Sequence, residues 1–178
     1  MSGEPSPPSD RFAGTRIPDS AFTGDDGSVA PGVAAALAAY DGGEATYAET
    51  LAVLQQSRLL VPVVAVAGEV DVDEQGLAHD KSSDMATVLL TGRDGRNALL
   101  AFTGIEPLRA WDPQARPVPV GTALAARSAA QDGAEAVVID VAGPTRFVIE
   151  GDDLAAVAAG WTLARVGERT AWIRPPKE

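Results

Sequence analysis

Residues 84–103 read Asp84-Met-Ala-Thr-Val-Leu-Leu-Thr-Gly-Arg-Asp-Gly-Arg-Asn-Ala-Leu-Leu-Ala-Phe-Thr103, and this stretch predicts a β-hairpin. The pair Asp94-Gly95 tolerates positive φ at both positions, as a two-residue type I′ turn requires. With that pair at the tip, Leu89 faces Leu100 across the hairpin. Both faces of the two strands are largely apolar, so neither face should contact water. We therefore expect a hairpin inside a sheet that is covered on both sides.

The stretches around this hairpin predict a second hairpin, one further strand and four helices. Pro31 suits the first turn of a helix, and Thr46-x-x-Glu49 has the spacing of a capping box. Pro62 lacks an N–H group, so its strand should lie at an edge or bulge there. The helices run from Pro31 to Gly42, from Thr46 through Leu54, over 122–131, and from a cap at Asp152 to Gly160; the strand covers 59–65, and the second hairpin pairs 136–141 with 146–149.

The order of these elements separates hairpins from helices, which is typical of an α+β fold and not of a doubly wound parallel sheet. We expect a single domain with a mixed, mostly antiparallel sheet of about five strands, built from two hairpins plus one strand and flanked by about four helices. The proline-rich segment 107–119 should be irregular. Residues 1–28, rich in Ser, Pro, Gly and Asp, are expected to be a largely disordered tail. Residues 161–178 form a C-terminal extension that could contain short strands.

The chain has 178 residues, a formal net charge of −11 and no cysteine. An acidic surface repels nucleic-acid phosphates and anionic lipids, so neither nucleic acid nor a membrane is an expected partner. The lack of cysteine excludes disulfides, thiol nucleophiles and cysteine metal ligands. Residues 1–10 lack the features of a signal peptide, and no apolar run reaches the ~20 residues that span a bilayer. We expect a cytoplasmic protein.

Few residues could carry catalysis or hold a metal ion. His79 is the only histidine, and no Gly-x-Ser-x-Gly motif accompanies it, so a solvated loop histidine is the simpler interpretation. Asp71-x-Asp73-x-x-Gly76 is similar to the start of a calcium-binding loop, but Ser82 stands where a glutamate should be the last ligand. A solvated acidic loop explains this run better. No P-loop or dinucleotide-binding motif occurs, so we predict no catalytic residue, no cofactor and no metal.

Two aspartates, Asp84 and Asp140, lie at the ends of predicted strands. A pair of carboxylates could do acid–base work. Hydrogen bonds in caps or turns are the simpler use of such residues.

Trp111 and Arg116 mark the most interesting surface of the sequence. Trp and Arg are the residue types that most often carry binding energy at interfaces, and the prolines around them stiffen the segment. In the alternative interpretation, Trp111 is a lid over the core and Arg116 is tied to a carboxylate. We treat both residues as candidates for binding a partner.

Several short pieces, in this order across residues 29–160, resemble the SseB family in the versions found in actinobacteria. The resemblance implies an SseB-like domain over residues 29–160 and brings with it no defined catalytic residue or cofactor. The family name refers to an effect on serine sensitivity in enterobacteria. The pieces are Leu59-Leu-Val-Pro-Val-Val64, Asp84-Met-Ala-Thr-Val88, Leu90-Thr-Gly-Arg-Asp-Gly-Arg96, Ala98-Leu-Leu-Ala-Phe-Thr103, Trp111, Ala115-Arg-Pro-Val-Pro119 and Asp140-Val-Ala-Gly-Pro144.

The sequence favours a non-enzymatic domain that binds another protein or itself, because the residue types of common catalytic sites are missing. A small-ligand or amino-acid-sensing module is the second hypothesis, prompted only by the link of the family to serine sensitivity. An enzyme with an unrecognised carboxylate or metal site is the third. A flat patch around Trp111 would favour protein binding, whereas a deep pocket with convergent polar groups would favour a ligand.

Overall fold

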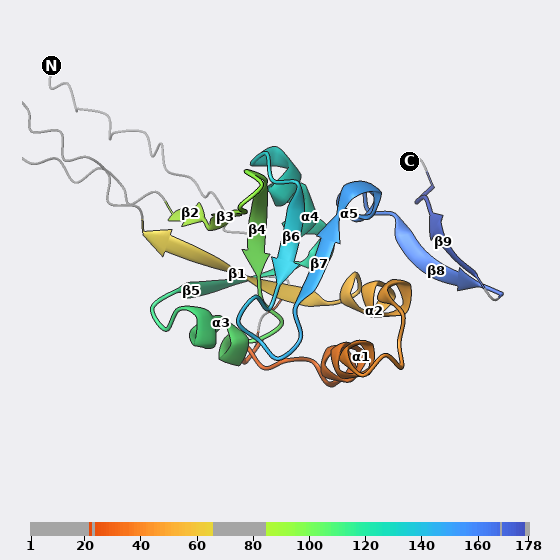
Figure 1. Ribbon diagram of the computed structural model, residues 1–178, viewed down its shortest axis with the longest axis horizontal. Helices are drawn as coiled ribbons and strands as arrows, with labels where there is room; N and C mark the ends of the chain where they lie inside the picture. Colours follow the sequence, from red (N-terminus) through yellow and green to blue (C-terminus); the bar gives the residue numbers. More distant parts are fainter. Residues whose placement is uncertain (1–21, 23, 66–84, 168, 177–178) are drawn as a thin grey trace, which may run out of the picture.

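The computed structural model describes residues 22, 24–65, 85–167 and 169–176 (Figure 1). Predictions about the tail 1–21, the acidic run 66–84, His79 and Asp84 lie outside these residues. The described chain forms five helices and nine strands, and the α+β class is confirmed. The elements are α1 (Pro31–Asp41), α2 (Tyr47–Leu54), β1 (Arg58–Ala65), β2 (Met85–Thr87), β3 (Leu89–Thr91), β4 (Asn97–Ala101), α3 (Ile105–Trp111), β5 (Arg116–Gly121), α4 (Thr122–Gln131), β6 (Ala136–Ile139), β7 (Phe147–Glu150), α5 (Gly151–Ala158), β8 (Thr162–Val166) and β9 (Arg169–Ile173).

A four-stranded sheet in the order β3-β4-β6-β7 is the centre of the domain. Both predicted hairpins belong to it, since β3 pairs antiparallel with β4 and β6 pairs antiparallel with β7. The hairpins meet through a parallel pair, β4 and β6, because α3, β5 and α4 run between them in the chain. The other described strands form a three-stranded group, β2-β1-β5, and a two-stranded ribbon, β8-β9. The described sheet structure is thus larger and more divided than the predicted sheet of about five strands.

The first hairpin has a different register from the predicted one. Leu89 pairs with Leu99, and a three-residue loop separates Gly92 from Arg96. The N–H of Gly92 donates to the carbonyl oxygen of Arg96 at 2.8 Å. Within this loop only Gly95 has a positive φ, +81°. A type I′ turn needs two such residues, whereas a three-residue loop needs one, so the prediction of a two-residue turn was wrong.

The segment 107–119 is more regular than predicted, because its prolines occupy positions that need no N–H group. Pro107 lies in the first turn of α3, where N–H groups have no partner within the helix. The backbone N–H and carbonyl groups of Leu60 in β1 both bond to Phe102. Pro119 of β5, which lies opposite Leu60, therefore forms no backbone hydrogen bond with it. Pro117 and Pro119 therefore direct their missing N–H groups away from β1, toward the edge of the sheet.

β1 is the middle strand of its sheet, not an edge strand as Pro62 suggested. On the side away from β5, Leu60 bridges to Phe102 and pairing with β2 begins only at Val63. Pro62 lies between these two partners, so its missing N–H group interrupts no ladder. β1 thereby links the two larger sheets.

The helix limits largely follow the sequence signals. Pro31 is the first residue of α1, and Thr46 and Glu49 form both bonds of the capping box of α2. The predicted cap at Asp152 is wrong, because α5 begins directly after β7 with Glu150 at the cap position and no side-chain cap bond. Asp152 lies in the first turn instead, where its negative charge favours the helix dipole.

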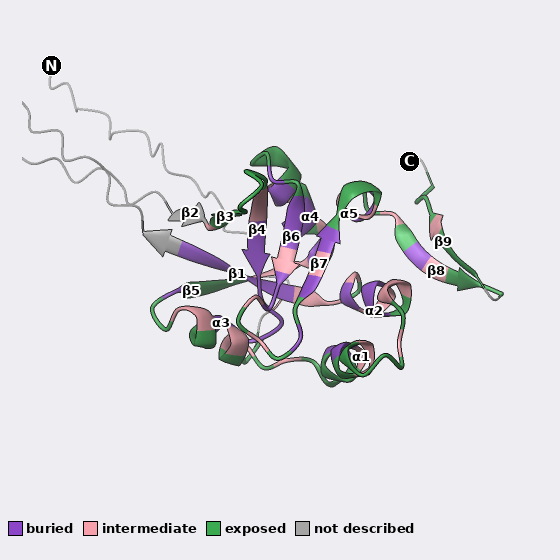
Figure 2. Cartoon of the chain, viewed as in Figure 1, coloured by how far each residue is buried: buried purple, intermediate pink, exposed green. Residues whose placement is uncertain are grey.

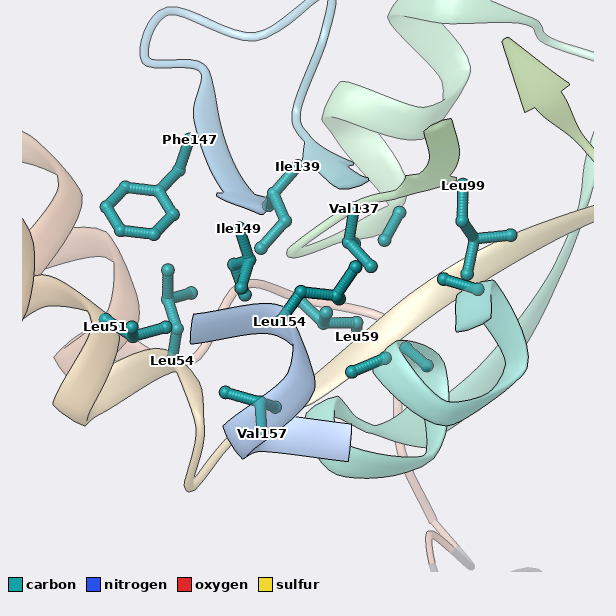
Figure 3. Close-up of a cluster of buried hydrophobic side chains, with 14 of the residues drawn as sticks. Leu51, Leu54, Leu59, Leu99, Val137, Ile139, Phe147, Ile149, Leu154 and Val157 are labelled. Atoms are coloured by element: carbon teal, nitrogen blue, oxygen red, sulfur yellow. The ribbon is translucent and has the colours of Figure 1, made fainter. Parts of the chain in front are cut away.

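The two faces of the four-stranded sheet carry separate buried clusters. Figure 2 shows that β4 and β6 are mostly buried or intermediate in exposure. On the inner face, side chains of the sheet and of β1 converge with those of α1, α2, α4 and α5. Figure 3 shows this for Leu99 and Ile149 of the sheet and for Leu59 of β1. α4 packs on the inner cluster through Ala125, Ala126 and Ala129, whose short side chains allow a close approach to the sheet. The outer cluster is smaller and consists of Leu60, Leu100, Phe102, Leu108 and Ala115.

The ribbon β8-β9 projects at the right of Figure 1 and lies in the C-terminal extension, where the sequence allowed short strands. Gln55 joins it to α2, because its side-chain amide donates to the carbonyl oxygen of Leu163 at 2.8 Å and accepts from the Leu163 N–H at 3.0 Å. Trp172 packs on the inner cluster, and its indole N–H donates to Asp153 at 3.0 Å. An isolated two-stranded ribbon is marginal in water, so these contacts hold it to the domain.

Gly95→Val should lower the free energy of unfolding by about 1–3 kcal/mol, because a β-branched residue resists the left-handed backbone that this position adopts. Gly95→Asn is the matched control, since Asn tolerates that region and should lose less. Urea unfolding measures both. A Val variant as stable as the wild type would contradict this loop geometry.

Gln55→Ala should release the ribbon without unfolding the domain. Two hydrogen bonds of about 0.5–1.5 kcal/mol each are lost, so amide hydrogen exchange in 162–173 should become roughly tenfold faster. Exchange in β4 and β6 should not change. Gln56→Ala, at the exposed neighbouring position, is the control. Unchanged exchange in the ribbon of the Gln55 variant would show that other contacts hold it.

Candidate functional site

The structure does not bring Trp111 and Arg116 onto one surface. Trp111 ends α3, is half-buried, and packs on Phe102 with 5.6 Å between ring centroids. Arg116 begins β5 and is exposed; in the described part of the chain no acidic side chain forms an ion pair with it. Ala115 joins the cluster of Trp111. Because side chains alternate along a strand, Arg116 points to the opposite face of β5.

The outer face of the four-stranded sheet is only partly covered. We define this outer face by Leu90 of β3, Ala98 of β4, Val138 of β6 and Val148 of β7, which line a groove of about 510 Å³. α3 and β1 cover the end of the sheet near Phe102, and no described helix packs on the rest. The predicted cover on both sides is therefore wrong for this part of the sheet within the described residues. Leu90 is 44% exposed.

β3 is also an edge strand of this sheet, because no other described strand pairs with its outer side. The backbone groups of Val88 and Gly92 bond to β4, so those of Leu89 and Thr91 point away from it. Leu89 is 36% exposed. Such an edge accepts an added strand, and β3 carries none of the charges or prolines that usually prevent this.

Charged side chains surround one end of the outer face. Arg96 binds Asp94 at 2.6 Å across the loop and Glu150 of β7 at 3.0 Å. Arg93 and Glu135 also line the groove. The rim therefore mixes both signs of charge, in contrast to the strongly acidic chain as a whole.

A separate cavity of about 560 Å³ lies at the carboxyl ends of the parallel strands β4 and β6. It lies between α1, α3 and the loop 140–145. The polar groups that line it are Asp41, Thr103, Glu106, Asp140 and Thr145. Carboxyl ends of parallel strands are a common place for ligands in sheets flanked by helices.

Asp140 occupies the inner end of this cavity in an unusual conformation. It is 4% exposed and has a φ of +53°. Among the described residues, all others with a positive φ are glycines. Its Oδ1 accepts the N–H of Thr103 at 2.8 Å, and its Oδ2 accepts the Thr103 hydroxyl at 2.6 Å. Burial raises the pKa of Asp140, while these hydrogen bonds act in the opposite direction. The simpler interpretation of Asp140, a hydrogen-bonding role at a strand end, describes these contacts.

Arg58 is a positioning residue that sequence reasoning missed. Its guanidinium donates to the carboxylate of Asp25 and to the carbonyl oxygens of Ser28 and Thr103. The hydrogen bonds from Arg58 lower the pKa of Asp25. Segment 24–29 is thereby tied to the carboxyl end of β4. An arginine before an apolar strand gives no sequence signal for contacts with residues about 30 and 45 positions away.

These features define an α+β domain with a partly open apolar sheet and a separate acidic cavity. Residues 33–156 match the family model described as SseB protein N-terminal domain, and this match spans more than half of the chain. The protein belongs to the SseB family, and the resemblance seen in the sequence is confirmed. The ribbon β8-β9 follows the matched residues.

The remaining comparisons add no relative. Neither the search of curated proteins nor that of solved structures found a match. Among the described helices, none has the length and apolar character needed to cross a bilayer. In the same residues, no group of three or more His, Cys, Asp or Glu side chains is placed to hold a metal ion.

Asp140→Asn should change how stability depends on pH. The folded pKa of Asp140 lies above its unfolded value of ~3.9, so between the two the folded protein binds more protons. The stabilisation by Asp140 is therefore full below the unfolded pKa and is lost as pH rises through the folded pKa. Asn does not titrate, so the unfolding free energy of the variant should rise relative to wild type over this range. Urea unfolding at a series of pH values measures the difference, and a difference that is constant with pH would contradict the raised pKa.

Proposed function

We propose that this protein is a non-enzymatic, cytoplasmic interaction domain whose partner covers the outer face. The observation that carries the proposal is the apolar surface of Leu90, Ala98, Val138 and Val148, which the described helices leave open. Contiguous exposed apolar surface on a folded protein marks an interaction site. The partner is another protein or a second copy of this chain.

Trp111 lies at the other end of this surface. Trp111 and Val138 both pack against the buried outer cluster of Leu100 and Phe102, so the apolar surface continues from the groove toward α3. A half-buried indole supported by a packed ring has the properties of an interface anchor. Arg116 points to the opposite face of β5, so it takes part only if the partner extends around that strand.

The non-enzymatic part of the proposal rests on the sequence. The chain has no cysteine, a single histidine and no recognised nucleophile motif. A catalytic site needs a nucleophile or a base together with a second group that orients it. Asp140, the buried carboxylate, has both oxygens bonded to Thr103 and is better suited to holding two strand ends together.

Leu90→Asp should reduce recovery of the partner roughly tenfold or more, because the partner would bury an unpaired carboxylate. The measurement is a quantitative pull-down from an extract of the source cells with tagged full-length protein. Leu124→Asp is the matched control, since Leu124 is 49% exposed on α4, the helix that packs on the inner face. Equal losses for both variants, or no loss for either, would contradict an interface at the outer face.

Trp111→Ala and Arg116→Ala should separate the two residues. If the indole is an anchor, the Trp111 variant should lose about 2 kcal/mol of binding free energy for the partner. Its melting temperature should change little. The Arg116 variant should lose less. Sedimentation of the same proteins distinguishes self-association from binding of another protein. Full binding by the Trp111 variant would remove α3 from the interface.

A further inference from the structure

We propose that the cavity between α1, α3 and the loop 140–145 binds a small ligand that carries an amine or another cationic group on a compact aliphatic body. This inference is independent of the outer face, because the two surfaces share no lining residue. A volume of about 560 Å³ lies within the usual range of small-molecule sites.

The walls of the cavity suit an aliphatic body. Three elements supply short apolar side chains that leave space and form no hydrogen bonds. They are Ala34, Leu37 and Ala38 of α1, Pro107 and Ala110 of α3, and Ala142 and Pro144 of the loop.

The charged groups of the cavity all have one sign. Asp41 is the last residue of α1 and Glu106 lies in the first turn of α3; both are exposed and line the cavity. Among the described residues that line it, none is a lysine, arginine or histidine. A cation is attracted by all these groups, whereas a carboxylate or phosphate is repelled.

The backbone at Asp140 shapes the loop that lines one side of the cavity. Its left-handed conformation turns the chain away from the direction of β6, so the loop becomes a wall beside α3. The N–H of Gly143 donates to the Asp140 carbonyl oxygen at 2.9 Å, and a Cβ at position 143 would lie 3.0 Å from the Asp140 Cβ. Real Cβ atoms seldom approach so closely, so glycine permits this closed loop.

The guanidinium of Arg58 does not neutralise the cavity. It bonds to the Thr103 carbonyl oxygen and to Asp25, and it is not among the lining residues. Asp25 offsets its charge locally. The carboxylates at the cavity mouth, Asp41 and Glu106, therefore remain available for a ligand cation.

The test titrates ¹⁵N-labelled full-length protein with hexylammonium chloride and follows the amide signals of Ala38, Ala110 and Gly143. Hexan-1-ol and sodium hexanoate carry an aliphatic chain of the same length and serve as the neutral and the anionic probe. We expect saturable shifts with hexylammonium, binding several-fold weaker with hexanol, and none with hexanoate. The variant with both Asp41→Asn and Glu106→Gln should bind hexylammonium roughly three- to tenfold more weakly, because charges exposed to solvent contribute only modestly to attraction.

Two further variants make the test specific. Ala38→Leu places a larger side chain at an exposed position of the cavity wall and should abolish the shifts with an unchanged melting temperature. Asp152→Asn removes an exposed carboxylate in the first turn of α5, which does not line the cavity, and should leave binding unchanged. Absence of saturable shifts, equal binding of hexylammonium and hexanol, or equal binding by wild type and the double variant would overturn the proposal.

Discussion

β4 has apolar side chains on both of its faces, and the domain is arranged around this constraint. Leu99 and Ala101 point to the inner cluster, whereas Leu100 and Phe102 point to the outer one. Each fully buried Leu or Phe side chain contributes about 1.5–3 kcal/mol, so both faces need cover. The helices supply it for the inner face, and β1 with α3 supplies it around Phe102. The rest of the outer face is where a partner would complete the cover, and that is the physical basis of the proposed interaction.

A second constraint lies where the parallel strands end. β4 and β6 run in the same direction, so their carboxyl ends meet at one edge of the sheet. Asp140 joins the two ends through both of its oxygens and then turns the chain away from the sheet. The same arrangement that satisfies a buried carboxylate therefore leaves a cavity beside α1 and α3. The domain can offer one surface to a protein and another to a small ligand.

The elements that the sequence predicted well are those with local signals. α4 is an alanine-rich stretch that stops before Gly133, and the capping box at Thr46 depends on residues three positions apart. The register of the first hairpin was missed because Asp94-Gly95 fits a type I′ turn and also the end of a three-residue loop. The prolines of 107–119 suggested irregular structure, although proline disturbs a strand only when its N–H position faces a partner.

The candidate sites were harder to predict because they depend on distant residues. Trp111 and Arg116 are close in sequence, yet Trp111 ends α3 and packs on the outer cluster, whereas the alternation along β5 turns Arg116 to the opposite face. Asp140 could be suspected from its place at a strand end, but its partner Thr103 lies 37 positions away. The outer face was expected to be covered because its residues are apolar. Apolar composition indicates that a face needs cover, but only the arrangement of the helices shows which part of that face the described residues leave uncovered.

The most direct test of the central claim is photo-cross-linking in living source cells with benzoylphenylalanine placed at position 90 or at position 124. Both positions carry exposed leucines, one on the outer face and one on α4. The account predicts a discrete higher-mass adduct from position 90 and none from position 124. No adduct from position 90, or the same adducts from both positions, would contradict the outer face as the binding surface.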